Sequence, residues 1–595
     1  MNTESGDSSA RRAHGDPRFD PDRPADMGPL YRAEAWRRLS TEQFDIVVIG
    51  GGVVGVGAAL DAATRGLRVA LVEARDIASG TSSRSSKMFH GGLRYLEQLE
   101  FGLVREALRE RELSLRLLAP HLVKPLPFLY PLTQRVWERP YVAAGLFLYD
   151  AMGGSKSVPG QRHVTRSGAL RVAPALKRDS LIGGIRYYDT VVDDARHSLT
   201  VARTAANYGA VIRTSTQVVG FLREADRVMG VKVLDTENGE TAEIRAHCVI
   251  NAAGVWTDEV QALSHERGHF RVRASKGVHI VVPRDRIVSE TAIILRTEKS
   301  VLFVIPWETH WIIGTTDTDW NLDLAHPAAT RADIDYILEH VNTVLVTKLT
   351  HDDIEGVYAG LRPLLAGEDE ATSKLSREHA VARVAPGLVS IAGGKYTTYR
   401  VMAADAVDAC DDFIPTRVAP SITERVPLVG ADGYFALINQ CEHLGSRYGL
   451  HPYRIRRLLN RYGSLIDDVL SYAADDPSLL RPLAGAPQYL RVEVVYAAVD
   501  EAALHLEDVL ARRTRISIEY SDRGVDCAQE VAELLAPILG WGSEQIEYEV
   551  RTYDARVAAE IASQRQPDDE SADALRAAAP ESRPELLEPV PVPDR

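Results

Sequence analysis

The chain has 595 residues, of which 45% are hydrophobic and 26% charged, a composition typical of a soluble protein with a large core in about two to four domains. Its 69 lysines and arginines are outnumbered by 83 aspartates and glutamates, and the formal net charge of −14 argues against a nucleic-acid-binding protein. The same charge opposes docking of the whole surface on anionic lipid. No signal peptide is visible, and no apolar run approaches the roughly 18–20 residues of a membrane span.

The cysteines give no sign of a metal site or a redox pair. Cys248, Cys410, Cys441 and Cys527 are far apart in the sequence, and no C-x-x-C occurs. We therefore predict reduced, buried thiols in a cytosolic compartment, and no metal.

The first strong pattern begins with a continuous β-branched run over residues 46–49, which is typical of a strand buried on both faces. Three glycines follow with the spacing G-x-G-x-x-G, namely Gly50, Gly52 and Gly55. They allow a tight turn, the approach of a pyrophosphate, and close packing of a helix on the strand. A second strand, residues 67–72, ends at Glu73, where an acid can bind ribose hydroxyls. The unit predicts a site for FAD or NAD rather than NADP, and a glycine-rich turn without a ligand is the alternative.

A loop rich in hydroxyl groups follows over residues 79–86. Its short donors lie beside the predicted dinucleotide turn and are Thr81, Ser82, Ser83, Ser85 and Ser86. We interpret them as cofactor-binding groups, with a plain surface loop as the alternative. His90, Gly91 and Gly92 then bring the backbone close to a flat or bulky group, and Arg94 and Tyr95 begin a predicted helix.

Longer motifs make this pattern specific. They are IGGGVVGVGAALDAATRG (49–66), SSRSSKMFHGGLRYL (82–96), GGIRYYDTVVDDARH (183–197), NAAGVW (251–256), IGTTDTDW (313–320), GLRPLLAG (360–367) and GGKYTTYRVMA (393–403). Together they resemble the bacterial, respiratory FAD-dependent glycerol-3-phosphate dehydrogenases over about residues 41–555.

The resemblance and the strand and helix patterns imply an α/β protein with three folded parts. A Rossmann-like FAD-binding part is expected over about residues 41–100, 190–265 and 355–415. An inserted antiparallel-sheet substrate or cap part covers about 101–189 and 266–354, with a helix from Thr330 to about residue 346. A C-terminal all-α domain covers 416–560. Residues 1–40, apart from a short helix at 31–39, and residues 561–595 are predicted to be mostly disordered because of their composition.

The resemblance implies tight binding of FAD and extends its site beyond the first turn. Val218 is expected to meet the adenine, and Ala253 and Gly254 the diphosphate. A second glycine turn should meet the flavin through Gly394, Lys395, Tyr396, Thr397 and Thr398. The start of a helix at this turn would stabilise negative charge on the reduced ring.

The same resemblance assigns candidate catalytic residues. Arg94 and Arg362 would hold a phosphate or a developing alkoxide, because arginine forks suit both, although each could instead be a structural ion pair. His90 is the first candidate for the general base and His279 the second. The remaining candidates, which would bind the substrate or hold the arginines, are Tyr95, Thr315 and Lys395.

The implied activity is oxidation of sn-glycerol 3-phosphate with electrons passed to a quinone. An oxidase that uses oxygen, another FAD oxidase of the same superfamily and a flavin-binding protein without turnover are the alternatives. Only one complete nucleotide-binding unit is found, so neither NAD nor NADP is expected as the electron acceptor. We expect a cytoplasmic homodimer that binds no nucleic acid.

Two further segments leave two interpretations each. Residues 120–154 mix prolines, aromatics and leucines with Lys124, Arg135 and Arg139, which suits either a membrane interface on the inner face of the cytoplasmic membrane or a cap packed on the FAD part. Arg512, Arg513 and Arg515 could form a solvated face or contact the FAD part or a partner.

Overall fold

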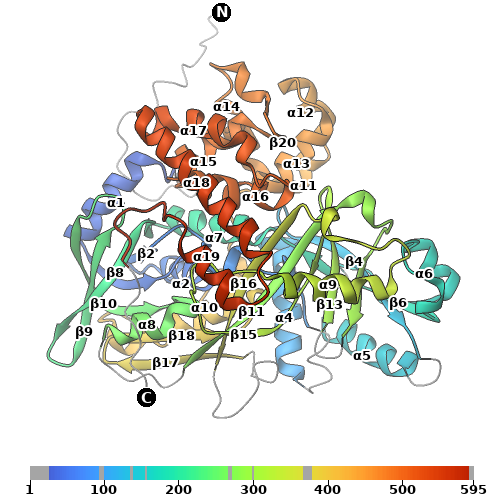
Figure 1. The fold of residues 1–595 in the computed structure, drawn as a ribbon. Helices are drawn as coiled ribbons and strands as arrows, with labels where there is room; N and C mark the ends of the chain where they lie inside the picture. Colours follow the sequence, from blue (N-terminus) through green and yellow to red (C-terminus); the bar gives the residue numbers. More distant parts are fainter. Residues whose placement is uncertain are drawn as a thin grey trace, which may run out of the picture.

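The computed structural model describes residues 26–92, 100–134, 138–153, 157–264, 271–297, 301–365 and 378–587. Two sheets lie side by side in one half of the molecule, and the C-terminal helices lie on top of them (Figure 1). The candidate residues Arg94 and Tyr95 lie outside the described part.

The first sheet has a parallel centre in the order β18-β10-β1-β2-β7. Its strands are β1 (Gln43–Ile49), β2 (Val69–Val72), β7 (Val211–Arg213), β10 (Thr241–Asn251) and β18 (Leu388–Gly393), with β17 (His379–Ala385), β8 (Thr216–Glu224) and β9 (Arg227–Asp235) added in antiparallel pairing. Ile46 and Val48 pack in one core and Val47 and Ile49 in another. The predicted burial of β1 on both faces is therefore confirmed.

Three helices cover one face of this sheet, α2 (Val53–Thr64), α7 (Asp194–Asn207) and α10 (Tyr399–Asp408). The predicted short helix before β1 is α1 (Pro29–Thr41), which packs on the other face. The turn between β1 and α2 depends on two glycines. Gly50 has a φ of +109°, and a Cβ on Gly55 would stand 1.9 Å from the carbonyl oxygen of Gly50. Only glycine fits either position without displacing the backbone.

The second sheet carries the substrate part in the order β15-β11-β14-β13-β12-β4-β6-β3. Its strands are β3 (Met88–Phe89), β4 (Lys124–Leu132), β5 (Arg162–Thr165), β6 (Gly183–Val191), β11 (Val272–Pro283), β12 (Ala292–Arg296), β13 (Val301–Trp307), β14 (His310–Gly314), β15 (Thr318–Trp320) and β16 (Gly356–Leu365). The pairing is antiparallel as predicted, except that β4 and β12 run parallel. Helix α9 (Arg331–Val344) packs on this sheet and is capped by Thr330, also as predicted.

One strand belongs to a different sheet than predicted. We assigned residues 355–365 to the FAD part, but β16 pairs with β11 along its whole length, from Val272 opposite Leu365 to Val281 opposite Gly356. The largely apolar sequence of β16 suits either sheet, so sequence alone did not distinguish the two. The pairing carries Arg362 into the substrate sheet, opposite Ser275.

Two helices with exposed apolar residues extend from the substrate part. They are α4 (Phe101–Leu113), which continues into the π-helical turn η3 (Ser114–Leu118), and α5 (Glu138–Gly153). A smaller helix, α6 (Arg166–Val172), lies between β5 and β6. Among the described residues, no helix is both long enough and apolar enough to cross a membrane.

The C-terminal domain is mainly helical, and it departs from the predicted all-α domain only in the short antiparallel pair β19 (Pro482–Leu483) and β20 (Ala486–Leu490). Its helices are α11 (Tyr434–Ile438), α12 (Cys441–Tyr448), α13 (Pro452–Tyr462), α14 (Ile466–Ser471), α15 (Arg491–Asp500), α16 (Ile516–Glu519), α17 (Val525–Leu539), α18 (Ser543–Ser563) and α19 (Asp569–Ala577). Their apolar faces form two cores of their own. All four cysteines are buried, as predicted.

The prediction of a disordered tail from residue 561 is wrong for residues 561–587. Helices α18 and α19 descend from the C-terminal domain onto β11 and β16 (Figure 1). Lys276 on β11 forms an ion pair with Asp569, and Arg583 is buried against Asp508 at 3.2 Å. The polar composition suggested disorder, but these residues pair with charges from distant parts of the chain. We name residues 578–587 the C-terminal strap.

Candidate active site

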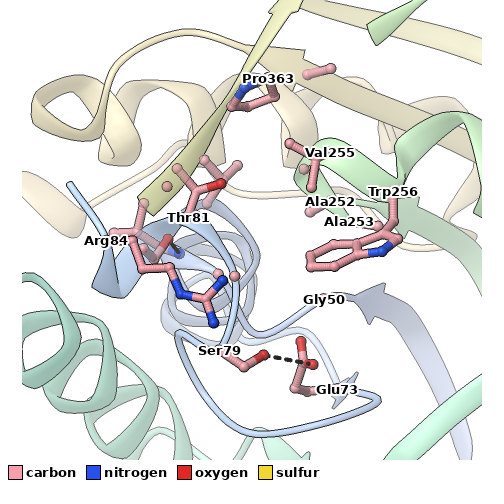
Figure 2. A pocket seen from close by; sticks show the side chains of 18 of the residues that line it. Gly50, Glu73, Ser79, Thr81, Arg84, Ala252, Ala253, Val255, Trp256 and Pro363 are labelled. Atoms are coloured by element: carbon pink, nitrogen blue, oxygen red, sulfur yellow. Dashed lines mark hydrogen bonds between the residues drawn. The ribbon is translucent and has the colours of Figure 1, made fainter. Parts of the chain in front are cut away.

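The glycine turn, the hydroxyl loop and the substrate sheet enclose one cavity of about 460 Å³. Figure 2 shows Glu73 and Ser79 on one side of it and Pro363, the neighbour of Arg362, on the other. Trp256 and Ala253 form part of the wall that faces the loop residues Thr81 and Arg84 (Figure 2). The cavity therefore joins the predicted nucleotide turn to the predicted catalytic residues.

Glu73 stands at the nucleotide side of this cavity. Its carboxylate accepts hydrogen bonds from the backbone N–H groups of Gly51 at 2.6 Å and Arg75 at 2.8 Å, which fix its direction. Burial raises the pKa of Glu73, and the two N–H donors oppose the rise. The predicted ribose-binding acid is thus held at the cavity wall.

The C-terminal strap closes the same side. Leu586 and Leu587 line the cavity together with Val218. The side chain of Gln217 bonds both backbone groups of Leu587, accepting from its N–H and donating to its carbonyl, each at 2.9 Å. The strap is therefore part of the wall of the nucleotide side.

The hydroxyl loop lines the cavity, but much of its bonding is to the protein itself. Ser82 Oγ accepts a hydrogen bond from the N–H of Val53, the first residue of α2, at 2.9 Å. Thr81 Oγ1 donates to the carbonyl of Leu361 at 2.5 Å. These bonds hold the loop against α2 and β16, so that it gives the cavity a fixed wall.

A buried charge network fixes the loop from behind. Asp194 accepts hydrogen bonds from the backbone and hydroxyl groups of Ser85 at 2.9 and 2.7 Å and pairs with Lys87 at 2.8 Å. Lys87 also donates to the carbonyl of Ser83 at 3.0 Å. Burial lowers the pKa of Lys87 to about 8, although Asp194 opposes the fall.

The C-terminal arginines complete this network, and the interpretation of a solvated face is wrong for them. Arg515 pairs with Asp193 at 2.5 Å and with Asp194, while Arg513 pairs with Asp76 at 2.6 Å. All three of Arg512, Arg513 and Arg515 are at most 4% exposed. The other interpretation, contact with the FAD part, is confirmed.

Arg362 is the central cation on the substrate side. Its guanidinium donates to Thr315 Oγ1 at 3.0 Å and to the carbonyl of Thr316 at 3.1 Å, and lies 3.4 Å from a carboxylate oxygen of Asp317. It crosses β11 at Gly277, where an added Cβ would stand 2.4 Å from Arg362 Nη2. Arg362 lines the cavity, whereas Thr315 holds the guanidinium from outside the lining.

Both candidate bases line the cavity. His279 is stacked on Tyr358 with ring centroids 4.8 Å apart, and its Nε2 lies 2.9 Å from Ser86 Oγ. Burial, followed by the charge of Arg362, lowers the pKa of His279 well below its usual value, so its imidazole is neutral at pH 7. The backbone N–H of His90 lies 3.2 Å from Thr397 Oγ1.

The second glycine turn lies beside these residues. Lys395 occupies the N-cap position of a short 3-10 helix, Tyr396–Thr398, and lines the cavity with Gly394, Tyr396 and Thr397. Tyr396 donates its hydroxyl hydrogen to the carbonyl of Asp194 at 2.6 Å. The turn is therefore tied to the network behind the hydroxyl loop.

Most of the candidates therefore meet at one cavity. Those that line it are Gly50, Gly52, Glu73, Thr81, Ser82, Ser85, Ser86, His90, Val218, Ala253, Gly254, His279, Arg362, Gly394, Lys395, Tyr396 and Thr397. Described candidates that do not line it are Gly55, Ser83, Gly91, Gly92, Thr315 and Thr398. For Gly91 the reason is that its N–H bonds the Tyr149 hydroxyl at 2.8 Å and its Cα packs against Leu108.

Several functional residues were not predicted. Asp194 could have been suspected, because a pair of acids before a helix is a helix N-terminus signal. Trp256 is part of a quoted motif, but nothing in the motif marks its ring as cavity wall. Leu586 and Leu587 carry no signal, because they lie in a segment rich in proline and glutamate.

The cavity fits FAD. Its volume lies within the roughly 300–1,000 Å³ of small-molecule and cofactor sites. Gly52 stands at the N-terminus of α2, where the helix dipole favours a diphosphate. Gly254 has a φ of +62°, and a Cβ built there would meet nothing within 4 Å, which leaves open space above the backbone for a bound group.

Comparison with known proteins agrees with this site. Residues 45–400 match the family model for FAD-dependent oxidoreductases, and residues 421–546 match the C-terminal domain of alpha-glycerophosphate oxidase. Glycerol-3-phosphate dehydrogenase 2 of Mycobacterium tuberculosis is 76% identical over 96% of this chain and 97% of its own, and the mitochondrial glycerol-3-phosphate dehydrogenase of Mus musculus is 36% identical over 88% and 74%.

Solved structures give the same result. The glycerol-3-phosphate dehydrogenase from Bacillus halodurans, complexed with FAD, superposes with a TM-score of 0.74 at 30% identity and covers 89% of this chain and 98% of its own. L-α-glycerophosphate oxidase from Mycoplasma pneumoniae, at 19% identity and a TM-score of 0.51, shares the fold. The chain therefore belongs to the FAD-dependent glycerol-3-phosphate dehydrogenases, and FAD is its cofactor.

Proposed function

We propose that the protein oxidises sn-glycerol 3-phosphate to dihydroxyacetone phosphate and passes the electrons to a quinone. The observation that carries the proposal is Arg362, a cation held in place by Thr315 and Asp317 at the wall of a cofactor cavity in a protein of net charge −14. A fixed guanidinium fork suits a phosphate or a developing alkoxide. Both kinds of group occur in this reaction.

Each residue has a distinct task in this reaction. FAD, when bound, supplies the ring that accepts a hydride. Arg362 binds and orients the substrate anion, with Thr315 and Asp317 preventing the guanidinium from turning away. Lys395 is a second cation that lines the cavity, and we expect Arg94 to add another.

As the general base that accepts the proton of the substrate hydroxyl, we propose His279 rather than His90, the first candidate from the sequence. His279 is neutral at pH 7, feels the charge of Arg362, and lies 2.9 Å from the Ser86 hydroxyl at the cavity wall. A neutral imidazole can accept a proton, and the reason for choosing His279 is its place beside Arg362 and Ser86, because a lowered pKa by itself makes a weaker base. His90 stays the alternative base.

A quinone is proposed as the acceptor because the chain has a single nucleotide-binding unit and exposes apolar side chains on α5. Tyr141 is 49% exposed, Phe147 69% and Leu148 38%. Arg109 on α4 and Arg116 on η3 are also exposed, and they form surface ion pairs with Glu424 and Glu112. Aromatic residues beside cations suit a lipid surface, where quinones dissolve, so we propose peripheral attachment to the inner face of the cytoplasmic membrane. A homodimer stays a prediction.

The first experiment tests the substrate. The visible spectrum of the purified holoenzyme is recorded without oxygen before and after addition of sn-glycerol 3-phosphate, with glycerol and glycine as controls. Bleaching of the flavin band by sn-glycerol 3-phosphate alone is expected. Bleaching by glycine instead, or by none of the three, would contradict the proposed substrate.

The second experiment tests the acceptor. Quinone reduction, oxygen uptake and NADH formation are measured at the same substrate concentration. Rapid quinone reduction with little peroxide is expected. Peroxide formed at the rate of quinone reduction would make the protein an oxidase, and NADH formation would show a second nucleotide site.

A further inference from the structure

A second cavity, of about 110 Å³, lies on the other side of the hydroxyl loop from the cofactor site. Its walls come from Ser83 and Arg84 of the loop, from residues 326–329, from β16, from residues 507–515, and from helices α16, α18 and α19. Helices α18 and α19 are the segment that descends onto the sheets in Figure 1. The cavity is therefore built only because the C-terminal segment folds back.

The lining of this cavity is strongly cationic. Its arginines are Arg84, Arg512, Arg515, Arg523, Arg556 and Arg576, and its carboxylates are Glu507 and Glu560. Two of the arginines are compensated from behind the wall, because Arg512 pairs with Asp76 and Asp508 and Arg515 with Asp193 and Asp194. The excess charge belongs to the other four.

Three of these four arginines contact the two glutamates. Glu560 lies 3.0 Å from Arg576 and 3.5 Å from Arg523, and Glu507 lies 3.8 Å from Arg556 and 3.2 Å from Arg512. Arg84 donates to the carbonyl of Ala325 at 2.9 Å, and within the described part of the chain it contacts no carboxylate. Four arginines thus face two glutamates in the lining, and Arg84 is the one that contacts no carboxylate among the residues described. A further carboxylate, Glu581, lies behind the wall, where it bonds His326 at 3.3 Å and interacts with Arg556.

Three groups at the wall show the effect of this charge. Burial, followed by repulsion from Arg576, lowers the pKa of Arg84 to about 10. Burial and then Arg556 lower the pKa of His326 to about 4. Burial opposes ionisation of Glu507, yet Arg512 and Arg556 hold its pKa at about 2. Burial is the largest cause of the first two shifts, and in all three the neighbouring arginines act in the direction of a positive potential.

We propose that this cavity is a binding site for a small phosphate-type dianion, held between Arg84, Arg523, Arg556 and Arg576. A dianion supplies negative charge to these four arginines, which face two glutamates in the lining, and guanidinium forks match its oxygens in pairs. Inorganic phosphate and a small phosphate ester are the two candidates. Both share this chemistry, and the titrations below separate them.

The site would act on the cofactor cavity through Arg84, which lines both cavities. Arg84 belongs to the loop whose Thr81, Ser82 and Ser85 are fixed against α2, β16 and Asp194. An anion that holds Arg84 reduces the freedom of this loop and tightens FAD binding, and FAD tightens anion binding by the same factor. This inference does not depend on the identity of the substrate.

The test is a calorimetric titration of the holoenzyme with inorganic phosphate and, separately, with glycerol 2-phosphate. The double variant Arg523→Gln/Arg576→Gln removes two ligands that do not line the cofactor cavity, and Arg565→Gln, an exposed residue after α18, is the matched control. We expect phosphate binding about 10- to 100-fold weaker in the double variant and unchanged in the control. The KM for sn-glycerol 3-phosphate should stay the same in both.

Equal phosphate affinity in the parent and the double variant would overturn the proposal. A crystal structure of the parent holoenzyme with selenate is a second test that does not depend on whether the variant folds. The anomalous signal of selenium locates the bound tetrahedral dianion directly. A peak between Arg84 and Arg576 is expected. A peak at Arg362 alone, or no peak, would exclude the site. Binding of glycerol 2-phosphate at this peak would widen the ligand class to phosphate esters.

Discussion

Replacing Arg362 by alanine should remove most of the activity while the protein still folds. A charged donor that acts in the transition state contributes about 2.7–4 kcal/mol, so kcat/KM should fall about 100- to 1,000-fold. The loss of its bonds to Thr315, Thr316 and Asp317 should cost about 1–3 kcal/mol of stability. That is smaller than the roughly 5–15 kcal/mol of a typical domain.

Two further variants separate charge from geometry. Arg362→Lys keeps the charge but loses the fork, and its kcat/KM should lie between those of the parent and Arg362→Ala. Arg273→Gln is the matched control, because Arg273 lies on β11 and pairs with Asp319 at 3.1 Å with both side chains exposed. A surface pair of this kind contributes about 0–1 kcal/mol to stability and should leave turnover unchanged.

The assay measures kcat/KM for sn-glycerol 3-phosphate with a dye as electron acceptor, together with the FAD content and thermal midpoint of each variant. The prediction requires that Arg362→Ala keeps its FAD. If it retains the kcat/KM of the parent, Arg362 does not bind the reacting anion. If Arg273→Gln loses as much as Arg362→Ala, the effect comes from the sheet rather than from the guanidinium.

His279→Asn should lower kcat and flatten the acidic limb of the pH profile. This limb lies well below pH 6.5, because the pKa of His279 is lowered. A flattened limb in His90→Asn instead would show that His90 is the base. The free energy of unfolding provides a second readout. As the pH falls, His279 is protonated in the unfolded chain at a higher pH than in the folded protein, so the stability of the parent should fall below about pH 6.5. Denaturant titrations at several pH values should show a smaller fall for His279→Asn. Deleting the C-terminal strap, residues 578–587, should release FAD faster, as followed by flavin fluorescence, and an unchanged release rate would show that the strap does not retain the cofactor. Phe147→Glu should reduce flotation with vesicles that contain anionic lipid, whereas Phe435→Glu, at a similarly exposed phenylalanine of the C-terminal domain, should not; equal flotation of both variants would place the contact elsewhere.

The parts of the fold that were predicted correctly are those specified by neighbouring residues. The β1 turn and α2 follow from a β-branched run and glycines within about a dozen positions. The capping of α9 by Thr330 is likewise local. Such patterns are read directly because the interactions that select them occur within a few residues.

The parts that were missed depend on contacts between distant residues. Arg515 reaches Asp193 across 322 positions, and Gln217 bonds Leu587 across 370. From sequence alone, arginines on a helix are predicted to face solvent, and so is a segment rich in proline. Only the contacts with distant residues show that both are buried. The sheet of β16 was misassigned for a related reason, because the apolar residues of a strand do not determine which strand it pairs with.

The C-terminal strap also has a consequence for the order in which the protein becomes functional. Chains are made from the N-terminus, and domains fold largely as units while synthesis continues. The wall residues between 49 and 402 are therefore synthesised long before Leu586 and Leu587. A nascent chain would hold an open FAD cavity, and retention of the flavin would begin only when the strap closes. Slow release of the yellow flavin would thus report that a molecule has been synthesised and folded through residue 587.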